Sequence, residues 1–288
     1  MQIYGLDFTS APGKRKPITC AECTFDGERL RLHAIEEFFD FAAFEAFLTR
    51  PGPWVAGMDF PFGQPRTLID NLRWGDTWEQ VIGSITALGD VNAFARTLAA
   101  YRATRAPGDK HHLRPIDSLA KSCSPMMMFG VPVGRMFFQG APRLERSAVS
   151  IVPNRPNDDS RTVLEAYPAL VARRWTAGKG YKSDEREKQS ELHRVRREAI
   201  VVGLFTDCAR HYGFEASMDR SAAENFVADP TGDRLDAFLC AVQTAWATTR
   251  RAAGWGVPAD CDRREGWIVD PAMFDPFTGN RSLAEPSR

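Results

Sequence analysis

The sequence lacks the long apolar segments and the one-sided charge that mark a membrane protein or a nucleic-acid coat protein. Its longest strongly apolar runs lie around residues 200–205 and 237–247, and both are too short to span a bilayer. No basic segment leads into an apolar one at the N-terminus, so we expect no secretory signal and no membrane partner. Lysine plus arginine number 37, as do aspartate plus glutamate, which excludes a uniformly basic surface but allows a local basic patch.

Cysteine is also sparse, and several familiar catalytic patterns are missing. Six cysteines are present, and only Cys20 and Cys23 lie close together, inside a predicted strand. A single C-x-x-C pair is weak support for zinc, and the low cysteine content favours a reduced, cytoplasmic protein. The sequence contains no P-loop, no G-x-S-x-G pattern, no histidine in a recognisable motif and no internal repeat. We therefore expect neither P-loop chemistry nor a serine or cysteine hydrolase.

What is present is an ordinary globular composition. Hydrophobic residues make up 43% of the chain and charged residues 26%, which argues against disorder. A length of 288 residues allows about two domains or one large one, and roughly three quarters of the unfolded surface can be buried. We expect a single α/β domain over residues 1–288.

The first sixty residues predict three strands, a helix and a fourth strand. The dipeptide Asp26-Gly27 suits a tight hairpin turn, and Asp40 can cap a helix that ends before Pro51-Gly52. The predicted strands cover residues 3–8, 16–25, 28–35 and 54–60.

The stretch from about residue 64 to 156 departs from this alternation, and we interpret it as a helical insertion or lid. Helices are predicted to start near Thr77 and Asp90. A fifth strand follows over residues 161–167, then a long amphipathic helix over 184–212 and a last helix over 232–251. The apolar face of the long helix is predicted to contain Leu192, Val195, Ala199, Val202 and Phe205.

Four aspartates occupy related positions. Asp7 ends the first predicted strand and Asp59 ends the fourth, so the two carboxylates meet if these strands are parallel neighbours. Asp233 and Asp236 are three residues apart in the last helix and therefore share one face, with Cβ atoms about 5–6 Å apart.

Each acid also has an ordinary interpretation. Asp7 and Asp59 could be turn formers, and Asp233 could cap its helix. Asp236 precedes the apolar body of a helix and Glu165 interrupts a buried strand, where an unpaired acid is costly. Carboxylates that converge without lysine or arginine partners repel one another unless a divalent cation lies between them. Together the five acids predict a metal site.

Short motifs in a fixed order resemble a known family. They are similar to those of domain-of-unknown-function family 429, described as predicted nucleases of the RNase H-like fold, from residue 3 to about 270. The final D-x-x-D also resembles Holliday-junction resolvases. The resemblance implies a five-stranded mixed sheet in the order 3-2-1-4-5, flanked by helices. The motifs are Tyr4-Gly5-Leu6-Asp7, Gly57-Met58-Asp59-Phe60-Pro61-Phe62-Gly63, Leu164-Glu165-Ala166-Tyr167-Pro168, Gly232-Asp233-Arg234-Leu235-Asp236-Ala237 and Glu265-Gly266-Trp267-Ile268.

The same resemblance implies a metal-dependent nuclease. Two ions about 3.5–4 Å apart would support phosphodiester hydrolysis, and an all-oxygen ligand set suits Mg²⁺ or Mn²⁺. Glu165 is a further catalytic candidate and Glu265 a weaker one. The implied metal ligands are Asp7, Asp59, Asp233 and Asp236.

Basic residues provide candidate contacts to nucleic acid, either DNA or RNA. The segment 96–121 holds six basic residues against two acids, a net charge of +4. A solvated helix face is the alternative interpretation of this charge. The predicted substrate contacts are Arg102, Arg105, Lys110 and Arg114, and a second basic run contains Arg173, Arg174, Lys179 and Lys182.

Two other functions stay open. An actin-like nucleotide-binding phosphotransferase begins with a similar strand and aspartate, and Thr9, Ser10 and Lys14 could then bind phosphates. A catalytically inactive RNase H-like binding protein is the other alternative, and whether the acids hold metal distinguishes it from a nuclease. The sequence indicates no oligomeric state.

Overall fold

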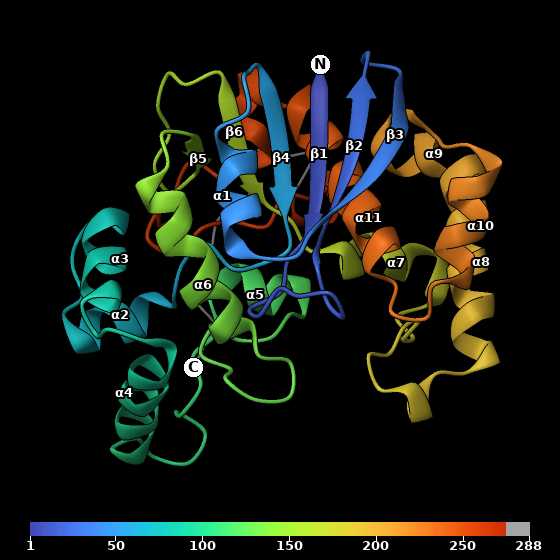
Figure 1. Ribbon diagram of the computed structural model, residues 1–288. Coiled ribbons are helices and arrows are strands. Elements are labelled where there is room, and N and C mark those ends of the chain that lie inside the picture. Colours follow the sequence, from blue (N-terminus) through green and yellow to red (C-terminus); the bar gives the residue numbers. More distant parts are fainter. Residues whose placement is uncertain (275–288) are drawn as a thin grey trace.

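A seven-stranded mixed sheet forms the centre of the computed structural model, which describes residues 1–274 (Figure 1). The strand order is β5-β6-β4-β1-β2-β3-β7. Strand β2 runs antiparallel to β1 and β3, whereas the other neighbouring pairs are parallel. The strands are β1 (Gln2–Asp7), β2 (Ile18–Phe25), β3 (Arg29–Phe38), β4 (Trp54–Met58), β5 (Ser150–Val152), β6 (Arg161–Glu165) and β7 (Glu215–Ser217).

The prediction of five strands in the order 3-2-1-4-5 was wrong for the sheet as a whole. The five segments predicted as strands do stand side by side, as β3-β2-β1-β4-β6. Strands β5 and β7 extend the two edges, and each has only three residues. A segment of three residues is too short to show an alternating pattern of apolar and polar residues. Pairing with distant segments, and not the local sequence, makes β5 and β7 strands.

Local signals explain the first elements. Gly27 takes a φ of +102° in the β2–β3 turn, a conformation that favours glycine. The Asp40 carboxylate accepts a hydrogen bond of 2.8 Å from the Ala43 amide and caps α1 (Phe41–Leu48). Thr77 and Gln80 form the capping box of the helix that follows.

Five helices separate β4 from β5. They are α2 (Arg66–Leu72), α3 (Trp78–Thr86), α4 (Val91–Ala103), α5 (Pro115–Ala120) and α6 (Val133–Arg146). In Figure 1, α2, α3 and α4 extend away from the sheet at the lower left, whereas α6 lies beside α1. The predicted end of this helical stretch, near residue 156, is corrected to the residue before Ser150, because β5 belongs to the sheet.

The sheet has a core on each face. Phe44 of α1 and Phe137 of α6 belong to the core that contains Leu6. Ile3 belongs to the opposite core with Leu235 and with residues of the helices that follow β6. Cys20 and Cys23 lie in different cores, which does not fit a shared zinc ion. The remaining helices are α7 (Pro168–Thr176), η1 (Arg186–Lys188), α8 (Glu191–Thr206), α9 (Cys208–Tyr212), α10 (Arg220–Ala228), α11 (Asp233–Thr249), η2 (Arg251–Gly256) and η3 (Pro271–Met273).

Helix α11 lies directly against β1 and β4. A Cβ atom built on Gly5 would lie 2.0 Å from the carbonyl oxygen of Ala237, and one on Gly57 would lie 2.1 Å from Oγ1 of Thr244. Glycine at these two positions therefore sets the separation between helix and sheet. This close packing brings the first turn of α11 to the carboxyl end of β1.

The long helix predicted over residues 184–212 is divided into shorter helices, and it does not bury the face that we predicted. It consists of η1, α8 and α9, and the predicted core residue Leu192 is 63% exposed. Val195, Val202 and Phe205 are exposed as well, whereas Ile200 and Leu204 pack into the core. Both faces of α8 carry apolar residues at helical spacing, so periodicity alone did not identify the buried face.

Within residues 1–274, no helix is long and apolar enough to cross a bilayer.

Candidate metal centre

Asp7 and Asp236 face one another across the interface of β1 and α11. Side chains alternate along a strand, and Ile3 and Gly5 contact the α11 side, so Asp7 also points toward α11. Asp236 lies in the first turn of α11, where a negative charge is favoured by the helix dipole. Asp7 is 4% exposed and Asp236 is 1% exposed. The structure therefore places both carboxylates in the interior, at the carboxyl end of the central strand.

Asp59 and Asp233 complete the group at its edge. Asp59 follows β4, and its amide donates to the carbonyl of Leu6 at 2.9 Å, which holds it beside the end of β1. Its carboxylate is half-buried and forms no hydrogen bond or ion pair with any residue that the structure describes. Asp233 is the first residue of α11 and is buried. We call Asp7, Asp59, Asp233 and Asp236 the acid cluster.

The acids are close enough to perturb one another. Burial raises the pKa of the Asp7 carboxyl well above its ordinary value, and the charges of Asp233 and Asp236 add to this rise. Burial likewise raises the pKa of Asp59 to about 7, with a further contribution from Asp236. Proton binding at neutral pH is one way to relieve the repulsion, and cation binding is another.

A half-buried lysine reaches into the acid cluster. The Lys182 ammonium forms an ion pair with Asp236 and lies 4.0 Å from Oδ1 of Asp7. Burial alone would lower the pKa of Lys182, but the carboxylates of Asp236 and Asp7 raise it well above its ordinary value. The neighbouring Tyr181 hydroxyl donates a hydrogen bond to Oδ1 of Asp236. Lys182 therefore supplies positive charge where a cation would be expected.

A second lysine holds Asp233. The Lys16 ammonium lies 2.7 Å from Oδ1 of Asp233 and 2.7 Å from Oδ1 of Asp184. The argument for a metal site considered carboxylates without lysine or arginine partners, and the structure gives Asp233 and Asp236 such partners. Lys16 and Lys182 are distant from the acids in sequence, and Lys182 stood only in a basic run interpreted as a nucleic-acid contact. Nothing in the local sequence around Lys16 identified its partner.

Glu165 belongs to a different, ion-paired group. The Arg114 guanidinium donates two hydrogen bonds to its carboxylate, at 2.6 and 2.8 Å, and the Phe62 amide donates a third at 2.9 Å. Arg114 also donates to both carboxylate oxygens of Asp117, at 2.8 and 2.9 Å. Glu165 is thus ion-paired with Arg114, and both line a pocket with Asp59, so its role as a metal-site or catalytic acid stays a prediction.

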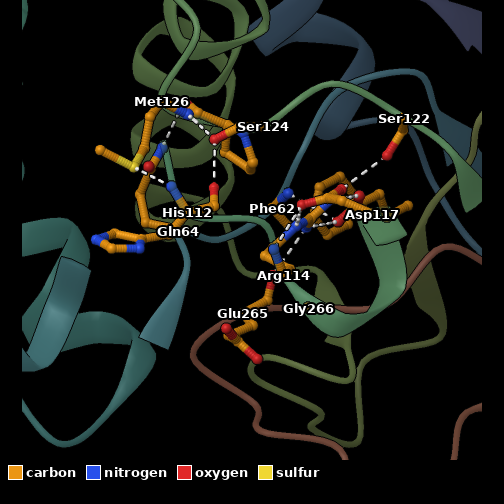
Figure 2. Close-up of polar contacts among 12 residues, drawn as sticks. Phe62, Gln64, His112, Arg114, Asp117, Ser122, Ser124, Met126, Glu265 and Gly266 are labelled. Atoms are coloured by element: carbon orange, nitrogen blue, oxygen red, sulfur yellow. Dashed lines mark hydrogen bonds and ion pairs between the residues drawn. The ribbon is translucent and has the colours of Figure 1, made fainter. Parts of the chain in front are cut away.

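Arg114 is enclosed by its acceptors (Figure 2). Figure 2 shows its guanidinium directed toward Asp117, whose carboxylate also accepts from Ser122 at 2.9 Å. The side chain donates as well to the Glu265 carbonyl at 2.8 Å and is 1% exposed. Through these contacts Arg114 links α5 to β6 and to the segment after η2, and its role in substrate binding stays a prediction. The Glu265 carboxylate accepts instead from the Arg66 amide at 2.6 Å.

The other predicted substrate contacts lie on α4 and the loop after it. Arg102 is half-buried and Lys110 is exposed, whereas Arg105 forms an ion pair with Asp109. In Figure 1, α4 lies at the lower left, away from the carboxyl end of β1. The structure therefore does not bring these residues to the acid cluster.

The second basic run is mostly engaged within the protein. Arg173 donates to the carbonyls of Ala120 and Lys121 at the end of α5. Arg174 pairs with the buried Asp270 at 3.0 Å. With Lys182 in the acid cluster, three of the four residues named in this run have internal partners.

The acid cluster fits a hard cation in charge and donor type. Its donors are all carboxylate oxygens, which suit Mg²⁺ or Mn²⁺. Oδ2 of Asp7 is buried and accepts no hydrogen bond from any described residue. Among residues 1–274, however, no three acidic, histidine or cysteine side chains stand close enough together to share one ion. A shared ion would therefore require these carboxylates to move closer together and Lys182 to leave Asp236.

Comparison with known proteins identifies the family. The family model described as "Protein of unknown function (DUF429)" matches residues 5–260, which include the whole acid cluster and Arg114. Neither the curated proteins nor the solved structures contain a match. The matched segment covers most of the chain, and the chain therefore belongs to the DUF429 family.

Proposed function

We propose that this protein is a metal-dependent nuclease that hydrolyses phosphodiester bonds of DNA or RNA. Asp7, Asp59 and Asp236 would hold Mg²⁺ or Mn²⁺, and Asp233 would join them if Lys16 releases it. Bound ions of this kind activate a water molecule and stabilise the charge on the leaving oxygen. Tyr181 orients Asp236 through its hydrogen bond, and Lys182 neutralises the carboxylates in the metal-free protein.

The proposal rests on the burial and the missing hydrogen bond of the Asp7 carboxylate. Its carboxylate is buried at the carboxyl end of the central strand, one oxygen accepts no hydrogen bond from a described residue, and its pKa is raised. An unsatisfied buried carboxylate is costly, so its retention needs a reason. Coordination of a cation would supply that reason, and ligands in open α/β sheets bind at this end of the strands.

We also propose that the sheet is of the RNase H-like type. Five of its strands stand in the order β3-β2-β1-β4-β6, with β2 antiparallel, and acids follow or end the neighbouring parallel strands β1 and β4. A cytoplasmic location, where the chain would meet nucleic acid and Mg²⁺, accompanies this proposal.

One observation favours a second candidate, an inactive binding protein of the same fold. The Lys16 and Lys182 ammoniums pair with Asp233 and Asp236, so these ion pairs could be permanent features of the structure. A phosphotransferase that uses Thr9, Ser10 and Lys14 has no comparable support.

Cleavage assays separate these candidates. The purified chain is incubated with Mg²⁺ or Mn²⁺ and with single-stranded, duplex and branched DNA and RNA. The proposal predicts cleavage of at least one substrate, abolished by EDTA and by Asp7→Asn. The matched control is Asp260→Asn, which removes the same charge from an exposed position. Binding without cleavage of any substrate would favour the inactive protein.

A further inference from the structure

A groove beside the acid cluster is lined by basic side chains, which the predicted contacts on α4 do not bring to the cluster. Its walls come from the β1–β2 connection, the end of α10 and the start of α11. Asp233 is one of the residues that line the groove, so the groove adjoins the proposed metal centre. The residues used below are Lys14, Arg15, Asp229, Thr231, Asp233 and Arg234.

Lys14 and Arg15 form the tip of a tight turn. Gly13 and Lys16 exchange two backbone hydrogen bonds of 3.1 Å, which leaves two residues between them. Lys16 points inward and pairs with Asp233 at 2.7 Å. The turn is therefore anchored to the acid cluster on one side and presents Lys14 and Arg15 to solvent on the other.

Lys14 and Arg15 have no ion-pair partner in the described part of the chain, whereas two of the three acids in the groove wall, Glu37 and Asp233, have one. Neither Lys14 nor Arg15 forms a hydrogen bond or ion pair within residues 1–274. Asp229 accepts from the amide and hydroxyl of Thr231, at 3.0 and 2.7 Å.

The other acidic wall residue away from the acid cluster is Glu37, and it also has a partner. Its carboxylate pairs with the Arg234 guanidinium at 2.9 Å. Since Lys16 pairs with Asp233 and Arg234 pairs with Glu37, the charges in the groove wall without an ion-pair partner among the described residues are those of Lys14, Arg15 and Asp229, a net charge of +1.

We propose that Lys14 and Arg15 bind a phosphate group of the nucleic-acid backbone, adjacent to the bond that is cut. The inference rests on the proposed nuclease function and deepens it, because it assigns the substrate contact to the β1–β2 turn instead of α4. Arg15 can donate two parallel hydrogen bonds to a phosphate, and Lys14 adds a point charge. An anchored turn loses little freedom on binding, which favours such a contact.

The test compares two double variants of equal charge. Lys14→Ala/Arg15→Ala and Arg102→Ala/Lys110→Ala each remove two positive charges from the surface. Binding of short fluorescein-labelled single strands and duplexes of DNA and RNA is measured by anisotropy in EDTA, over a salt series. Thermal melts of both variants confirm that they fold like the wild type.

We expect the turn variant to bind about tenfold more weakly and the α4 variant to change less than about twofold. The slope of log affinity against log salt should fall by about 0.7 for single strands in the turn variant, the change expected for the one phosphate that the protein no longer neutralises. Equal losses in the two variants, no loss in the turn variant, or no binding by the wild type would overturn the inference.

Failure of the inference and failure of the proposed function give different results. If the wild type cleaves nucleic acid and the turn variant binds normally, only the phosphate contact is rejected. If the turn variant binds weakly but the wild type cleaves nothing in Mg²⁺ or Mn²⁺, the contact stands and the nuclease function is rejected.

Discussion

Replacing Asp59 by asparagine should make metal-free stability depend less on pH. The folded protein binds the Asp59 proton more tightly than the unfolded chain does, since burial raises its pKa from 3.8 to about 7. The wild type therefore loses stability as the pH rises from about 4 to about 7, and the full cost persists above that range. Such a shift corresponds to about 4 kcal/mol, and partial solvent access reduces this to about 2 kcal/mol.

Urea unfolding of both proteins in EDTA tests this expectation. The stability of Asp59→Asn relative to the wild type should rise by about 2 kcal/mol between acidic and mildly alkaline buffer. Saturating Mg²⁺ should then stabilise the wild type, by about 2.7 kcal/mol at a hundred times the dissociation constant, and should stabilise the variant less. Asp260→Asn controls for net charge. A difference between wild type and Asp59→Asn that stays constant across pH would refute the argument.

Four further substitutions test the packing of the protein. Arg114→Met leaves two buried carboxylates, including that of Glu165, without their cation, and should cost about 3–5 kcal/mol in urea unfolding; a loss below about 1 kcal/mol would contradict the ion-paired assignment. Gly5→Ala should cost about 3 kcal/mol, because its Cβ would overlap the α11 backbone, and a neutral melt would show that α11 can move. Leu192→Ala should change stability by less than about 0.5 kcal/mol, whereas Ile200→Ala on the same helix should cost about 2–5 kcal/mol; the reverse order would mean that α8 is oriented the other way.

Local sequence was sufficient for most of the fold because local interactions create most of its elements. The Asp26-Gly27 turn and the Asp40 cap form within a few residues and lie where the sequence predicts them. The short edge strands depend on pairing across distant segments, as does the choice of buried face on α8. On α8, the exposed face with Leu192 and the buried face with Ile200 both have apolar residues at helical spacing. Only tertiary packing decides which of the two faces is buried.

The candidate site was predictable in its acids and unpredictable in its cations. Asp7 stands out because it ends the first predicted strand, and Asp236 because it precedes the apolar body of a helix. Lys182 reaches Asp236 across 54 residues of sequence, and Arg114 reaches Glu165 across 51. A basic residue in a loop carries no local signal of its partner, so Arg114 and Lys182 were both assigned to nucleic-acid binding.

Binding of Mn²⁺ is the most direct test of the central claim that the acid cluster is a metal centre. Calorimetric titration of the metal-free wild type should show Mn²⁺ binding accompanied by a rise in melting temperature. Asp7→Asn should remain folded and lose this binding, because an amide replaces the carboxylate whose Oδ2 accepts no hydrogen bond from a described residue. A wild type that binds neither Mn²⁺ nor Mg²⁺, or an Asp7→Asn protein that binds as well as the wild type, would contradict the account.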